Sequence, residues 1–132
     1  MARPKHEHPT PAELEVLKII WERGPSTVRD VLDALPAERS RAYTSVMSLL
    51  NVMADKGLLT RAPHGRAFIY NARADREKTL GRLVRDLLGR AFEGSASLLV
   101  GHVLAQGKPS ERELEEIRRT LEGYRQEEGG AR

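Results

Sequence analysis

The sequence predicts a mainly α-helical protein with two domains. The N-terminal domain has three helices and a β-hairpin, and the C-terminal domain has three helices. Apolar residues recur at helical spacing in six segments, which Gly, Pro and capping residues separate. Between the third and fourth segments the spacing changes to two, as in paired strands. We place the domains at residues 10–72 and 73–132, preceded by a disordered arm at residues 1–9.

The first two helices are marked by caps and breaks. Thr10 and Glu13 form a capping box around Pro11, which suits the first position of a helix. Gly24-Pro25 ends this helix, and Ser26 or Thr27 caps the second, which ends at Pro36. The side chains expected to point inward are Leu14, Leu17, Ile20, Trp21, Val28, Val31, Leu32 and Leu35, with Trp21 in the core.

The third helix is predicted within residues 41–59, ended by Gly57 in a left-handed conformation. Its apolar face comprises Val46, Leu49, Leu50 and Met53. The opposite face gathers Arg41, Thr44, Ser48 and Asn51, with Asp55 as its only acid. A solvated face would usually carry Glu and Lys pairs, whereas short hydroxyls and amides can hydrogen-bond base edges in a major groove. We therefore interpret this helix as a DNA-reading element.

A hairpin follows, with strands at Leu59–Ala62 and Arg66–Tyr70 joined by Pro63-His64-Gly65. Three helices followed by a hairpin is the order of a winged helix-turn-helix, in which the hairpin is the wing. Residues 39–72 carry five Lys or Arg against one Asp, a balance of +4, and such clustering suits phosphate contacts. The residues predicted to contact double-stranded DNA are Arg41, Tyr43, Thr44, Ser45, Ser48, Asn51, Arg61, His64 and Arg66.

The C-terminal domain contains a helix-packing seam from Leu80 to Phe92, a short apolar helix at Ala96–Leu104, and a last helix capped by Ser110 with a frayed tail after Glu127. A unit of this size buries too little apolar surface to be stable alone. We expect a second copy to cover it, giving a two-fold homodimer. The predicted dimerisation residues are Leu80, Leu83, Val84, Leu87, Leu88, Phe92, Leu98, Leu99, Val103 and Leu121.

Several function classes are excluded. The chain has no cysteine, which rules out disulfides and cysteine-based metal or catalytic sites. No apolar run approaches the ~20 residues of a membrane span, and the N-terminus lacks a signal peptide, so we expect a cytoplasmic protein that contacts no membrane. We find no paired nucleophile and base and no phosphate loop, and we predict neither an enzyme nor a cofactor. His6 and His8 on an arm lack the geometry of a metal site, and His102 suits an interface or a core.

Several segments, in this order and spacing, resemble the penicillinase-repressor family of BlaI, MecI and CopY regulators. They are Thr10–Leu17 with Trp21, Tyr43–Ser48, Lys56–Leu59, Gly65–Tyr70 and Phe92–Ser95. The resemblance implies a homodimeric transcriptional repressor that binds an inverted-repeat operator of the TACA/TGTA type. It also implies release through a sensor, which is a membrane metalloprotease system in the β-lactam members and metal binding in the copper members.

The chain departs from both release schemes. It lacks the C-terminal cysteine motif of the copper members, and Gly101-His102 stands where the proteolysed members have Asn-Phe. We therefore expect release by an event in the C-terminal domain, either cleavage by a sensor protease or displacement by another protein. Many members also have arginine where this chain has Asn51-Val52.

Alternatives remain for the main interpretations. Arg41, Thr44 and Ser48 could form a solvated helix face, and Arg61, His64 and Arg66 could be ordinary surface residues. Tyr43 could contact DNA or support the core. A different function class is a winged-helix module that binds another protein and no DNA, but that class leaves the basic middle segment unexplained.

Overall fold

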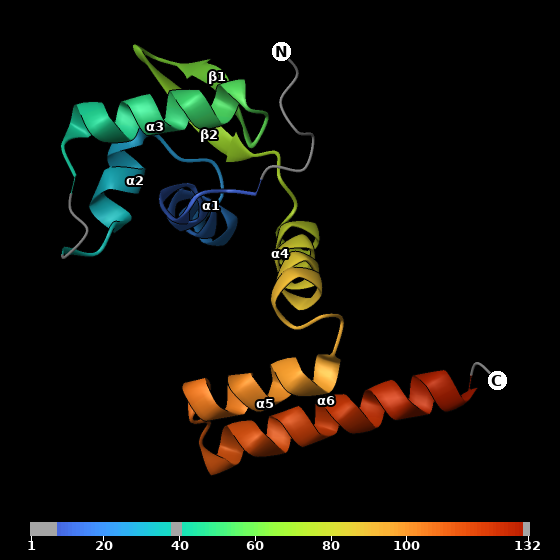
Figure 1. Cartoon of the computed structure of the whole chain (residues 1–132). Helices are drawn as coiled ribbons and strands as arrows, with labels where there is room; N and C mark the ends of the chain where they lie inside the picture. The colour runs from blue at the N-terminus through green and yellow to red at the C-terminus, as the bar shows by residue number, and fades with distance from the viewer. Residues whose placement is uncertain (1–7, 38–40, 131–132) are drawn as a thin grey trace. The chain divides into compact units, whose positions relative to one another are not determined.

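The computed structural model describes residues 8–37 and 41–130 as helices with one two-stranded antiparallel sheet (Figure 1). The predicted arm at residues 1–9 therefore lies mostly outside the described residues. The chain divides into two compact units, the first ending at Arg85 and the second beginning at Asp86.

Three helices open the first unit: α1 (Pro11–Arg23), α2 (Val28–Ala34) and α3 (Tyr43–Asp55). The capping box of α1 is confirmed, because Thr10 and Glu13 each accept a hydrogen bond from the other's backbone. Thr27 caps α2 in the same way with Asp30, and these hydrogen bonds lower the pKa of the Asp30 carboxyl. Both caps fix where the chain turns into a helix.

The third helix begins later than the sequence suggested. Ala42 is its N-cap in an extended conformation, so Arg41 precedes the helix. The predicted stop is confirmed, since Gly57 has a φ of 86°. Val46, Leu50 and Met53 are the buried residues of α3, which leaves its polar face outward.

The hairpin consists of β1 (Leu59–His64) and β2 (Ala67–Ala72), joined by Gly65-Arg66. The predicted loop at residues 63–65 was wrong, because Pro63 belongs to β1 and lies opposite Phe68. The pair His64–Ala67 closes the turn, and Pro63–Phe68 is the next pair along the hairpin. Hydrogen-bonded and non-hydrogen-bonded pairs alternate in an antiparallel ladder, so no hydrogen bond is required from the proline nitrogen there. Ser26 and Tyr70 exchange backbone hydrogen bonds of 2.8 and 2.7 Å, which attaches the segment before α2 to β2.

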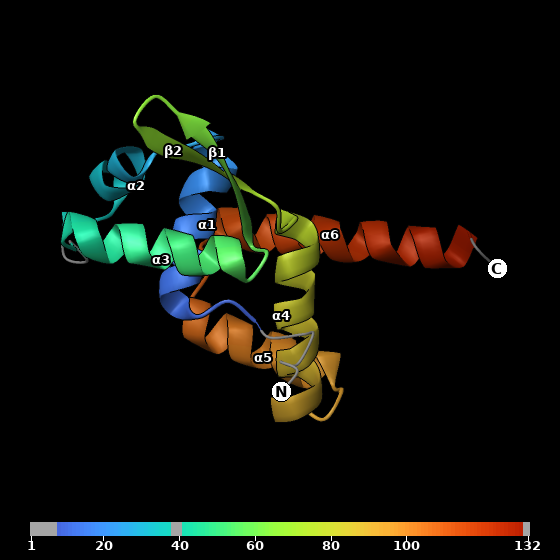
Figure 2. The same ribbon diagram turned by 90° about the horizontal axis from the view of Figure 1, so that it is seen from above.

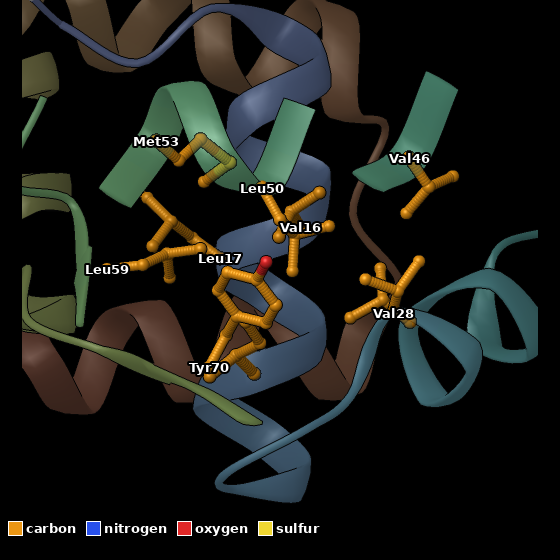
Figure 3. Packing of buried hydrophobic residues seen from close by; sticks show 10 residues of the cluster. Val16, Leu17, Val28, Val46, Leu50, Met53, Leu59 and Tyr70 are labelled. Atoms are coloured by element: carbon orange, nitrogen blue, oxygen red, sulfur yellow. The ribbon is translucent and has the colours of Figure 1, made fainter. Parts of the chain in front are cut away.

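All of these elements contribute to one core in the first unit. The Tyr70 ring lies among side chains from α1, α2, α3 and β1 (Figure 3). Trp21 is only partly buried, which corrects the prediction that it lies in the core. Its indole Nε1 donates to the Ala74 carbonyl oxygen at 2.9 Å, as a tryptophan with a polar edge requires. The buried apolar residues are Val16, Leu17, Ile20, Val28, Val31, Val46, Leu50, Met53, Leu59 and Tyr70.

An ion pair joins the start of α1 to the end of α3. Lys56 Nζ lies 2.9 Å from Glu13 Oε2, and the Glu13 side chain is 3% exposed. Burial alone would raise the pKa of the Glu13 carboxyl, but its hydrogen bonds with Thr10 and Lys56 outweigh burial and hold that pKa below its usual value. This pair therefore ties the first turn of α1 to the C-terminal end of α3.

The second unit is helical. Helix α4 (Arg76–Ala91) begins in the first unit and enters the second, followed by α5 (Ala96–Gly107) and α6 (Glu111–Gly130). Helix α5 is longer than predicted because Lys108, not Gly107, adopts the left-handed cap, with a φ of 44°. The prediction of a frayed tail after Glu127 was also wrong. Helix α6 continues to Gly130, because residues 126–128 are strong helix formers.

Candidate nucleic-acid interface

The outward face of α3 carries short polar side chains. Thr44, Ser45 and Ser48 are exposed, and Tyr43 is 40% exposed at the start of the helix. Arg41 is exposed immediately before this helix. Ala42 makes no side-chain cap hydrogen bond, so the first amides of α3 have no capping side chain. These five predicted residues therefore lie within the first two turns of α3 or just before it, and all are exposed.

The hairpin lies beside the C-terminal half of α3, as the two views in Figures 1 and 2 agree. Three predicted contact residues are exposed on it: Arg61 within β1, His64 at its end, and Arg66 in the turn. Gly65 has a φ of 63°, which allows the tight two-residue turn that presents Arg66. A protruding basic hairpin beside a polar helix can contact a phosphate backbone while the helix contacts bases.

Asn51 occupies a different environment from the other predicted residues of α3. Its Oδ1 accepts hydrogen bonds from Arg61 Nη1 at 2.7 Å and from the Tyr70 hydroxyl at 2.8 Å. Burial raises the pKa of the Tyr70 hydroxyl, which therefore stays protonated as a donor. The structure brings the Asn51 side chain together with the hairpin, whereas Thr44, Ser45 and Ser48 are exposed.

Sequence reasoning missed two aromatic contacts at this surface. The Arg29 guanidinium lies 5.4 Å from the Tyr43 ring centroid, and the Arg61 guanidinium lies 5.2 Å from that of Phe68. Such cation–π contacts restrict long, flexible side chains. Phe68 is 43% exposed on β2, and strand alternation places it on the same face of the hairpin as Arg61, which could have indicated this contact.

No metal centre is formed by the part of the chain that the structure describes, since no group of three or more His, Cys, Asp or Glu is arranged to hold one. His6 lies outside the described residues. The His102 ring contacts Phe92 edge-on, with centroids 5.1 Å apart. None of the described helices is both long and apolar enough to cross a membrane.

The predicted dimerisation residues lie on α4, α5 and α6, except Phe92 in the turn after α4, and none is buried in the single chain. Five of them are about half exposed or more, namely Val84, Leu87, Leu98, Val103 and Leu121. The others are partly covered: Leu80, Leu83, Leu88, Phe92 and Leu99.

Comparison with known proteins identifies the family. The sequence model of the penicillinase repressor family matches residues 9–123. The chain belongs to this family. Its members are transcriptional repressors and not enzymes.

Individual relatives agree with that assignment. The transcriptional regulator BlaI of Mycobacterium tuberculosis is 34% identical over 83% of this chain and 79% of its own length. The penicillinase repressor of Bacillus licheniformis is 25% identical over 86% of this chain and 89% of its own length. The structure of the transcriptional regulator Tm0710 from Thermotoga maritima covers 94% of this chain and 80% of its own, with a TM-score of 0.50. At 16% identity, that likeness concerns the fold alone.

Proposed function

We propose that this protein is a homodimeric repressor that binds an inverted-repeat operator of the TACA/TGTA type and inserts α3 of each protomer into the major groove. The observation that carries the proposal is the outward face of α3, where short polar side chains stand beside a basic hairpin. Membership of a repressor family supports it. Since its target is chromosomal DNA, the protein acts in the cytoplasm.

Within each half-site, α3 supplies the sequence-dependent contacts. Thr44, Ser45 and Ser48 can donate to or accept from base edges, and Arg41 can reach a guanine or a phosphate. Tyr43, held by Arg29, contacts the backbone at the start of the helix. The hairpin residues Arg61, His64 and Arg66 contact phosphates and carry no sequence information directly. In this scheme residues 10–72 form the DNA-binding domain.

Residues 73–132 serve as the dimerisation domain. Large apolar side chains that stay exposed in a single chain mark a surface that another protein covers. A second copy is the simplest cover, because an isologous contact places two equivalent DNA-binding domains about a two-fold axis. Joining two half-site contacts raises affinity by ~10²–10⁴ over a single domain.

Release of the operator follows from this arrangement. An event that disrupts α5 or α6 would separate the protomers and remove the gain from joined binding. Cleavage by a sensor protease and displacement by another protein are the two routes. Limited proteolysis followed by a gel-shift assay tests whether a cut within residues 95–107 abolishes operator binding.

The proposal is tested by substitutions that separate base contacts from phosphate contacts. Arg41→Ala and Ser48→Ala should weaken operator binding by ~1–3 kcal/mol per half-site while changing binding to random DNA less. Arg66→Ala should weaken both and flatten the salt dependence by about one unit of slope. Arg112→Ala, on the exposed surface of α6, is the matched control and should change neither.

The operator itself comes from selection on random duplexes, and the variants are then titrated at two salt concentrations. Unchanged affinity for all three interface variants would contradict the proposal. Absent or salt-insensitive DNA binding would instead indicate a winged-helix module that binds another protein.

A further inference from the structure

Asn51 links α3 to the hairpin by two side-chain hydrogen bonds. Its Oδ1 accepts from Arg61 Nη1 at 2.7 Å and from the Tyr70 hydroxyl at 2.8 Å. Arg61 and Tyr70 lie directly opposite each other in the β1–β2 register. One carboxamide oxygen therefore joins the recognition helix to both strands at the same level of the sheet.

These two hydrogen bonds limit what Asn51 can do on DNA. An asparagine reads adenine with its oxygen as acceptor and its nitrogen as donor together. A carboxamide oxygen has two lone pairs, and here each one accepts a hydrogen bond from the protein. Adenine recognition would require breaking one of them. One belongs to a tyrosine that is only 1% exposed.

Arg61 is held from two sides by the same arrangement. Its guanidinium donates to Asn51 and lies 5.2 Å from the centroid of the Phe68 ring. A long side chain fixed before binding loses less conformational freedom when it meets a phosphate. Asn51 thus affects the one exposed cation of β1 without needing to touch the nucleic acid.

We propose that Asn51 is a positioning residue for DNA binding, which acts through Arg61 by fixing the hairpin and its guanidinium against α3 and does not read a base. The inference rests on the proposed function and assigns the recognition helix two roles. Its first turns read bases, and its last turns orient the wing.

A double-mutant cycle between Asn51→Ala and Arg61→Ala tests the proposal. Each single variant should weaken binding to operator and to random duplexes alike, by roughly 3- to 10-fold per half-site. The double variant should bind as Arg61→Ala does, because Asn51 has no further route to DNA. Asn71→Ala, an exposed asparagine on β2, is the matched control and should bind within about two-fold of the parent.

Removing Asn51 leaves the buried Tyr70 hydroxyl without its acceptor, which can destabilise the fold. The cycle is therefore repeated with Tyr70→Phe present, where both partners of that hydrogen bond are absent and thermal unfolding should stay close to that of Tyr70→Phe alone. The coupling between Asn51 and Arg61 should persist in this background.

Two results would overturn the inference. Additive effects of the two substitutions, with lost discrimination at one base pair, would make Asn51 a base-reading residue. Full affinity in Asn51→Ala, alongside weakened binding in Arg61→Ala, would leave Asn51 without a role. Failure of the proposed function looks different, because then Arg41→Ala, Ser48→Ala and Arg61→Ala would all bind as the parent does.

Discussion

The two units of the molecule use apolar side chains in opposite ways. In the first unit, side chains from three helices and a hairpin surround one another, and ten apolar residues of the described chain are buried. In the second unit, none of residues 86–129 is buried, although α5 carries three leucines and two valines. The difference lies in geometry, because a core needs elements packed on more than one side of each apolar face. The first unit supplies such elements within one chain, whereas for the second unit we propose that a second copy supplies them.

The largest effect should come from charging the uncovered surface. Leu87→Asp combined with Leu99→Asp places four carboxylates into the proposed dimer interface. Burying each leucine contributes roughly 1.5–3 kcal/mol, and a dimer buries four of them. The dissociation constant of the dimer should therefore rise by at least ~10⁴-fold. Sedimentation velocity measures the result.

Its control is Arg85→Asp with Gln106→Asp, which introduces two acids at exposed polar positions of α4 and α5 and should leave the dimer intact. A double leucine variant that still sediments as a dimer would place the interface elsewhere.

A core substitution in the first unit should have the next largest effect. Leu50 is fully buried in α3, and Leu50→Ala should lower the free energy of unfolding by ~2–5 kcal/mol. Val52→Ala changes the same helix at a residue 47% exposed, and should alter stability by under ~0.5 kcal/mol. Urea unfolding followed by circular dichroism compares the two. If both variants lost the same free energy of unfolding, Leu50 would not be the buried residue that the structure shows.

The Glu13–Lys56 pair should give a smaller and pH-dependent effect. Glu13→Gln should lower the free energy of unfolding near neutral pH by roughly 1.5–3 kcal/mol, because it weakens a charged hydrogen bond. The folded state depresses the pKa of Glu13 below 4.5. Its contribution is therefore complete above that value and declines as the pH falls through the folded pKa.

The parent and Glu13→Gln should thus converge in stability as the pH drops below about 4.5, when unfolding is measured at a series of pH values. Glu22→Gln, an exposed glutamate of the same helix, serves as the control and should follow the parent. A constant gap between parent and Glu13→Gln across the acid range would count against this account.

The smallest effects should come from helix caps, and they distinguish the units most directly. Thr27 caps α2 and Ser95 caps α5 through equivalent side-chain hydrogen bonds. Replacing either with Ala should cost ~1 kcal/mol. The loss in Thr27→Ala should be independent of protein concentration, whereas Ser95→Ala should shift the concentration at which the dimer forms. If the stability of both variants depended on protein concentration in the same way, the two caps would not distinguish the two units.

Local sequence signals located the first unit's helices, although α3 begins at Tyr43 and not at Arg41. Thr10 and Glu13 marked the start of α1, and Gly57 marked the left-handed turn after α3. These signals depend on neighbouring residues only, so they can be read without the fold. The order of three helices and a hairpin then followed from the change in apolar spacing after Gly57.

Signals that depend on pairing were harder to read. Pro63 suggested a loop because it lacks an N–H, but only the register shows that its position opposite Phe68 needs none. The same register places Arg61 opposite Tyr70 and brings both to Asn51. Helical spacing alone put Asn51 with Thr44 and Ser48, since it cannot say which residues the hairpin contacts. The outcome for the individual interface residues rests on the experiments proposed above.

The hydrogen bond between Trp21 and Ala74 also bears on the order in which the protein can be made. It joins residues 53 positions apart, and Leu59 and Tyr70 enter the same core from the hairpin. A growing chain that has produced α1, α2 and α3 still lacks these closing contacts. Distant contacts of this kind form late, because the intervening chain must first be ordered. We therefore expect that, during synthesis, α3 acquires its fixed position only after the hairpin has left the ribosome.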